Sequence, residues 1–185
     1  KVADATIMLQ ELATENAADN AVVAWSLPDV QKEAGNILSE IATDNVQGVA
    51  DILNTIPAAD AATVLAAMEK LPEILVAMTT NQEGDLVNVV NTATILANSV
   101  FVGDNGPEDQ TKRAGVLEAM ITTDASGALL GVNNVAAILT ADSFFTSYSS
   151  TKQAILAEMN ADKAAAILND IAFNDELRAA ILANS

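Results

Sequence analysis

The stretch NADKAAAILNDI at residues 160–171 decides the fold class of this chain. Asn160 predicts a helix N-terminus, because its side chain can accept hydrogen bonds from the free amides of a first helical turn. The small residues that follow lead to Ile167 and Leu168, which place an apolar stripe on one helix face. Such a short helix is only marginally stable alone in water, so it has to pack against neighbouring helices.

A β-branched residue followed by leucine recurs along the whole chain. The pair occurs at 37–38, 52–53, 64–65, 74–75, 95–96, 116–117, 138–139, 155–156, 167–168 and 181–182, at irregular separations of 10 to 22 residues. Alanines precede several of these pairs and allow adjacent helices to approach closely. The pattern predicts an all-α fold, a superhelix or solenoid-like array of about ten short helices. An irregular helical bundle is the alternative.

The chain of 185 residues predicts a single all-helical domain over 1–185. Two subdomains joined near 101–107 are the alternative, because the clearest loop runs from Gly103 to Gly106. No segment sustains the alternation of a strand, so no β-structure is predicted.

Several helix boundaries follow from residues that cap or break helices. Asp44 and Asp60 are predicted to cap two helices of the first half, and Asn133 or Asn134 a helix of the second half. A longer helix is predicted over 85–99.

Composition excludes several classes of function. The chain has no cysteine and no histidine, which removes disulfides, thiolate metal sites and the common catalytic triads. It has 25 acidic and 8 basic residues, for a net charge of −17. So negative a surface repels nucleic-acid phosphates and attracts cations or basic partners. We therefore expect no enzyme and no nucleic-acid binding.

No apolar run is long enough to cross a bilayer, so we expect a soluble protein without a transmembrane segment. Lys1 in place of an initiator methionine fits a chain whose targeting peptide was removed, for example in a plastid, and it equally fits a trimmed chain.

Residues 160–171, followed by NDELRAAIL at 174–182, resemble the repeat in the N-terminal domain of MgtE-type magnesium channels. The segment VADILNTIPAADAATVLAAM at 49–68 is similar to it as well. The resemblance implies a right-handed superhelix of short helices that acts in regulation or protein interaction rather than in catalysis. The channel's membrane domain has no counterpart here, so the resemblance does not imply channel function.

One loop could hold a metal ion. Asp104, Glu108 and Asp109 place three carboxylates close together, and oxygen ligands suit weak Mg²⁺ or Ca²⁺ binding. The alternative is a plain turn in which Glu108 and Asp109 favour a helix N-terminus. No other cofactor is expected.

The few aromatic residues are candidates for binding a protein partner. Phe144, Phe145 and Tyr148 form a local cluster, and Trp25 is the only tryptophan. The alternative for both is packing inside the protein.

We therefore expect a non-catalytic helical scaffold or linker subunit that binds other proteins in a larger assembly. A peripheral subunit of a membrane complex, such as a photosystem–antenna assembly, is one setting that fits. The alternative function is a divalent-cation-responsive regulatory domain similar to the MgtE N-terminal domain. An enzyme based on unrecognised carboxylate chemistry is a third hypothesis.

Overall fold

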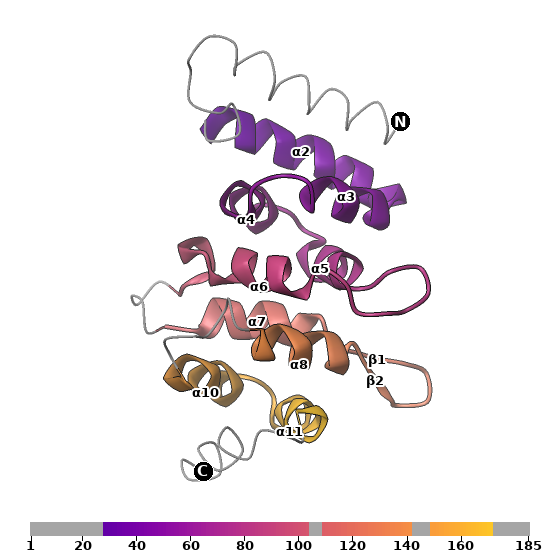
Figure 1. Cartoon of the computed structure of the whole chain (residues 1–185), viewed down its shortest axis with the longest axis vertical. Coiled ribbons are helices and arrows are strands. Elements are labelled where there is room, and N and C mark those ends of the chain that lie inside the picture. Colours follow the sequence, from indigo (N-terminus) through magenta and orange to yellow (C-terminus); the bar gives the residue numbers. More distant parts are fainter. Residues whose placement is uncertain (1–27, 104–108, 142–148, 172–185) are drawn as a thin grey trace. The chain divides into compact units, whose positions relative to one another are not determined.

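The computed structural model describes residues 28–103, 109–141 and 149–171 (Figure 1). These residues confirm the predicted all-α fold. They form α2 (Pro28–Asp44), α3 (Val46–Leu53), α4 (Ala58–Ala66), α5 (Leu71–Thr79), α6 (Val89–Ala97), the 3-10 helix η2 (Ser99–Phe101), α7 (Thr111–Ala119), β1 (Thr122–Thr123), β2 (Leu129–Leu130), α8 (Val132–Thr140), α10 (Ser149–Glu158) and α11 (Ala161–Asp170).

The chain divides into two compact units, Lys1–Met78 and Thr79–Ser185. Residues 101–107, where the sequence suggested a junction, belong to the second unit. The superhelical arrangement stays a prediction.

In the first unit, α2 packs on both α3 and α4. Gly35 of α2 faces α4, and a methyl group at its α-carbon would stand in ordinary van der Waals contact with the carbonyl oxygen of Val64, at 3.6 Å. The branched-leucine pairs of α3 and α4 are buried, as the sequence pattern predicts (Ile52, Leu53, Val64, Leu65).

In the second unit, α8 lies between α6 and α11, while α7 packs on α10. The pairs Ile95-Leu96 on α6 and Ile138-Leu139 on α8 are completely buried. Each such side chain contributes about 1.5–3 kcal/mol on removal from water. Burial of these pairs stabilises helices that are only 9 residues long.

Two short hairpins project from this unit on the same side (Figure 1). Arm 1 spans residues 79–88 and has a bridge between Thr80 and Leu86. Arm 2 spans residues 121–131, and its antiparallel strands β1 and β2 pair Thr122 with Leu130 and Thr123 with Leu129. The expectation of no β-structure was therefore wrong. With two residues per strand, the arms are too short to show an alternating pattern.

The arms are copies of one repeating element. Arm 1 begins with Thr-Thr-Asn-Gln-Glu-Gly at residues 79–84. Arm 2 contains the related stretch Thr-Thr-Asp-Ala-Ser-Gly at residues 122–127, which is 43 residues later. The same separation relates Ile95-Leu96 of α6 to Ile138-Leu139 of α8. An arm and the helix that follows it thus form an element that occurs twice among the described residues.

The predicted helix over 85–99 begins later than expected, at Val89 of α6. Asn88 has a left-handed backbone with φ of 51°, as has Gly84 with φ of 86°, and both belong to arm 1. Because left-handed residues cannot continue a right-handed helix, residues 85–88 turn back instead.

Three predicted caps were wrong. Asn45, not Asp44, caps α3 by accepting a hydrogen bond from the amide of Gly48 at 2.8 Å. Asp60 lies in the first turn of α4, whose N-cap is Pro57.

In α8 the N-cap is Gly131, so neither Asn133 nor Asn134 caps that helix. Asn160 caps α11 as predicted, with its side-chain oxygen 3.0 Å from the amide of Asp162.

We expect Gly131→Ala to lower the free energy of unfolding by about 2–3 kcal/mol. Gly131 has φ of 82°, and a methyl group there would collide with the carbonyl oxygen of Met120. Gly127→Ala is the matched control, because Gly127 has φ of 87° but open space around it. The control should cost only about 1 kcal/mol. Urea unfolding measures both, and equal losses would contradict a role for the Met120 carbonyl.

Candidate functional site

Most of the residues that the sequence suggested for binding lie outside the described part of the chain. These are the metal candidates Asp104 and Glu108 and the partner candidates Trp25, Phe144, Phe145 and Tyr148. Among the described residues, no group of three acidic side chains is placed to hold a metal ion.

The structure describes Asp109, and its carboxylate binds the backbone at the start of α7. Its Oδ1 accepts a hydrogen bond from the amide of Thr111 at 3.0 Å, and the carboxylate covers Gly103. Asp109 thus lies just before α7 and accepts a hydrogen bond from its first turn.

The exposed apolar surface gathers at the arms. Within the described residues, the large hydrophobic side chains left in solvent are Leu86, Val90 and Leu130, with exposed fractions of 42%, 59% and 52%. Leu86 and Leu130 belong to the two arms, and Val90 follows arm 1 at the start of α6. All three therefore lie on the arms or directly after one of them.

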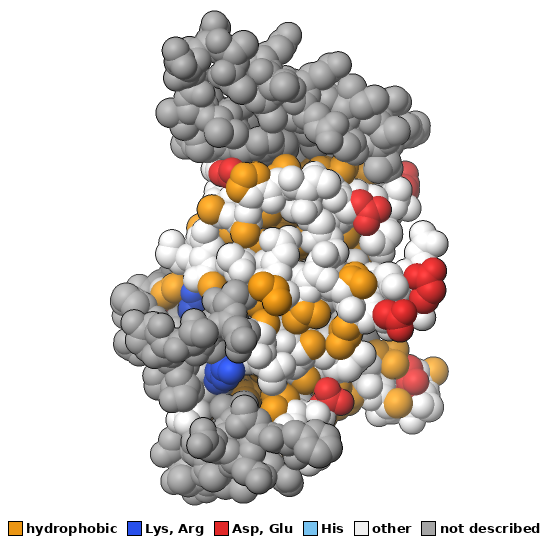
Figure 2. All heavy atoms as spheres, viewed as in Figure 1, with side chains coloured by type: hydrophobic (Ala, Val, Ile, Leu, Met, Phe, Trp, Pro, Cys, Tyr) orange, Lys and Arg blue, Asp and Glu red, His pale blue; other side chains and the backbone are white. Residues whose placement is uncertain are grey.

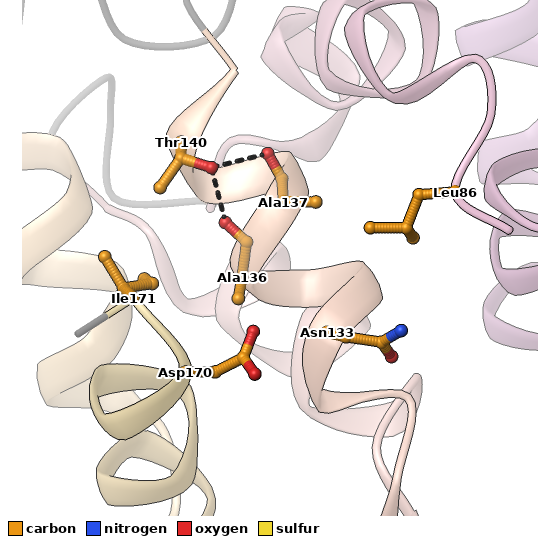
Figure 3. Close-up of a pocket in the computed structure, with 7 residues that line it drawn as sticks. All are labelled: Leu86, Asn133, Ala136, Ala137, Thr140, Asp170 and Ile171. Carbon is orange, nitrogen blue, oxygen red and sulfur yellow. Dashed lines mark hydrogen bonds between the residues drawn. The ribbon is translucent and has the colours of Figure 1, made fainter. Parts of the chain in front are cut away.

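A groove of about 370 Å³ opens beside arm 1. Figure 3 shows Leu86 on one side of α8 and the end of α11 on the other. The floor is α8, whose small residues leave the space. The lining residues are Leu86, Asn133, Ala136, Ala137, Thr140, Asp170 and Ile171. We call these seven residues, together with Val90 and Leu130, the arm surface.

Acidic side chains border this apolar surface. Over the arms of the second unit, Figure 2 shows carboxylates close to the apolar patches. Glu83 and Asp85 on arm 1, Asp124 on arm 2 and Asp170 on α11 are all exposed. Within the described chain, none of these four forms an ion pair with a lysine or arginine. The arm surface thus combines apolar side chains with the carboxylate of Asp170, and the arms carry further carboxylates.

A buried amide fixes the root of arm 1. Asn134 of α8 is 5% exposed, and its Nδ2 donates to Thr79 Oγ1 at 2.9 Å and to Thr80 Oγ1 at 2.6 Å. A buried polar side chain with satisfied partners restricts the positions its neighbours can take. Arm 1 is thereby held against α8, where Leu86 forms a groove wall.

In each arm, a side-chain oxygen at the equivalent position accepts hydrogen bonds that close the turn. The side chain is an asparagine in arm 1 and an aspartate in arm 2. In arm 1, Asn81 Oδ1 accepts a hydrogen bond from the amide of Asp85 at 2.8 Å. In arm 2, Asp124 Oδ1 accepts from the amides of Ser126 and Ala128 and from the Ser126 hydroxyl, at 2.7–2.9 Å. The Ser126 hydroxyl above all, and then the backbone amides, lower the pKa of the Asp124 carboxyl below its usual value.

Cations of this chain hold the C-terminal ends of helices. In the first unit, Lys70 donates to the carbonyls of Ala42 and Thr43 at the end of α2, at 3.2 and 3.4 Å. In the second, Lys163 donates to the carbonyl of Glu118 in the last turn of α7 at 2.9 Å, and lies 4.0 Å from the Glu118 carboxylate. Both place positive charge at the negative end of a helix dipole.

Arg113 performs this role inside the core of the second unit. It is 7% exposed and donates to the carbonyls of Leu96, Ala97 and Asn98 at 2.8–3.2 Å, and to Gln110 Oε1 at 2.8 Å. Burial lowers the pKa of the Arg113 guanidinium. The side chain joins the end of α6 to α7.

Sequence reasoning missed the arm surface, although one signal was available. The Thr-Thr-(Asn/Asp)-x-x-Gly motif occurs twice, each time before a branched-leucine helix. Asparagine, aspartate and glycine at these positions are typical of turns. Alignment of these two copies would have predicted both arms.

No known protein family, no curated protein and no solved structure shows significant similarity to this chain. The likeness to the MgtE N-terminal domain therefore stays a prediction. Among the described helices, none combines the length and the apolar character that crossing a bilayer requires.

As pH falls, we expect the turn of arm 2 to lose its hydrogen bonds at a pH at which the turn of arm 1 is still closed. The pKa of Asp124 is lower in the folded chain than the value of about 4 for an unfolded aspartate. Its stabilisation is therefore complete above the unfolded pKa and is lost as pH falls through the folded pKa. Hydrogen exchange at the amides of residues 122–130 should become faster over that pH range. The turn of arm 1 should show no such pH dependence, because Asn81 is neutral. Asp124→Asn is the control and should remove the difference between the arms, whereas its persistence would point to another titrating group.

We expect Arg113→Met to lower the free energy of unfolding by about 2–4 kcal/mol, since buried carbonyls at the end of α6 lose their donor. Lys32→Met is the control, because Lys32 is an exposed cation on α2. It should change stability by less than about 0.5 kcal/mol. Thermal unfolding followed by circular dichroism compares them, and similar values for both would argue against the structural role of Arg113.

Proposed function

We propose that this chain is a non-catalytic helical scaffold or linker module that binds another protein through the arm surface. The observation that carries the proposal is the position of Leu86, Val90 and Leu130. The other large apolar side chains of the described residues are buried or partly buried, whereas these three stand at the arms. Binding would remove them from water, which supplies the main driving force of protein association.

The arms have the rigidity that such a surface needs. Arm 1 is tied to α8 through Asn134, and arm 2 is closed through Asp124. A surface that is already ordered loses little conformational entropy on binding, so more of the contact energy becomes affinity.

Composition supports a role without catalysis. The chain has neither histidine nor cysteine, the usual general base and the strongest nucleophile of enzymes. A linker or peripheral subunit of a larger assembly, including an assembly at a membrane, needs only binding surfaces. The divalent-cation-responsive regulatory domain remains the second hypothesis, supported by the charge of −17 alone.

Site-specific crosslinking tests this proposal. A photoreactive amino acid is placed at Val90 or Leu130 of the full-length tagged chain, which is expressed in its native cells. We expect each position to give a crosslink to the same discrete protein. Ala157 is the control, because it is exposed on α10 of the same unit and lies outside the arm surface. Equal crosslinking from Ala157, or no crosslink from both arm positions, would contradict the proposal.

A further inference from the structure

The groove beside arm 1 has an apolar floor and a negatively charged side chain at one end. These two features indicate the chemistry of a ligand that would fit it. Its walls are Leu86 and Ile171, and its floor is formed by Ala136 and Ala137. Asp170 stands at its border with an exposed carboxylate. A hollow of about 370 Å³ that is open to solvent accepts side chains from a partner rather than enclosing a whole ligand.

Two helices end at this groove. Thr140 is the last residue of α8, Asp170 is the last residue of α11, and both line the hollow. Their final carbonyls add the negative ends of two helix dipoles to the Asp170 carboxylate. Neither helix has a basic residue in its last turn, and within the described chain no lysine or arginine donates to these carbonyls.

Elsewhere in the same unit, a lysine binds the carbonyl and carboxylate acceptors at a helix end. At the end of α7, Lys163 contacts both the carbonyl and the carboxylate of Glu118. Asp170 stands at the end of α11 much as Glu118 stands near the end of α7. The end of α11 thus has the two kinds of acceptor found at the end of α7, a last-turn carbonyl and a carboxylate.

We propose that the groove binds a basic amphipathic helix of the partner protein. An aliphatic side chain of that helix packs on Ala136 and Ala137 between Leu86 and Ile171. A lysine or arginine one turn away on the same helix face pairs with Asp170 and the last carbonyls of α11. This inference rests on the proposed function, because it names the partner chemistry of one part of the arm surface.

The probe is a synthetic amphipathic helix of leucine, alanine and lysine, titrated into the full-length ¹⁵N-labelled chain. Two peptides of equal length serve as comparisons, one with glutamate in place of lysine and one with the same composition in scrambled order. We expect shifts at the amides of residues 136–140 and 170–171 with the lysine helix. The scrambled peptide keeps the charge but loses the apolar face, so it should bind about tenfold more weakly.

Two pairs of variants separate the groove from the general negative charge. Asp170→Asn should weaken binding about three- to fivefold. Glu158→Gln removes one charge from the exposed last residue of α10, outside the groove, and should have little effect.

Ala137→Trp should fill the groove and abolish the shifts, whereas Ala157→Trp should not. Thermal unfolding checks that both tryptophan variants fold, and Asp170→Asn still tests the groove should Ala137→Trp unfold.

The outcomes decide between distinct conclusions. Equal losses for Asp170→Asn and Glu158→Gln, or binding that survives Ala137→Trp in a folded protein, would overturn the inference and show attraction by net charge alone. No binding of the lysine helix would overturn it as well. In each case, partner crosslinks from Val90 and Leu130 would leave the proposed function standing, because neither residue lines the groove.

Discussion

Burial of the branched-leucine pairs is the interaction on which the rest of this structure depends. Apart from α2, the described α-helices have 8 to 10 residues, too few to be stable as isolated helices in water. Ile95-Leu96, Ile138-Leu139 and Ile155-Leu156 fill the space between neighbouring helices of the second unit. The alanines beside them, such as Ala93 and Ala136, are buried as well and bring the helix backbones close together. The short helices of this chain are therefore stable only when they pack against one another.

Short helices also create many helix ends, and each end leaves backbone groups without partners. At the N-termini of α3 and α11 the chain meets this demand with asparagine, Asn45 and Asn160 respectively. At three C-termini it uses Lys70, Arg113 and Lys163, which are three of only 8 basic residues. Cations that bind helix ends do little to screen the exposed carboxylates.

The duplicated arm–helix element differs between its two copies in the residues that lie in solvent. Within the repeat, the pairs that face the core keep their apolar character, while the turn residues can vary because they lie in solvent. Asn81 and Asp124 close equivalent turns with an amide and a carboxylate, respectively. Position 90 of α6 is valine and the equivalent position 133 of α8 is asparagine, so the two copies present different surfaces. Duplication followed by divergence of exposed positions can produce a specific docking surface without altering the core.

The sequence by itself determined the all-α class, the burial of most of the described branched-leucine pairs and the cap at Asn160. These features follow from local periodicity and from side chains that bond to their own backbone. Only the tertiary structure decided that residues 85–88 turn back and that Asn134 is buried beneath arm 1. It also decided that Leu86, Val90 and Leu130 stay in solvent while equally apolar side chains are covered. Exposure depends on which helices lie side by side, and that depends on contacts between residues far apart in the chain, which a local pattern does not contain.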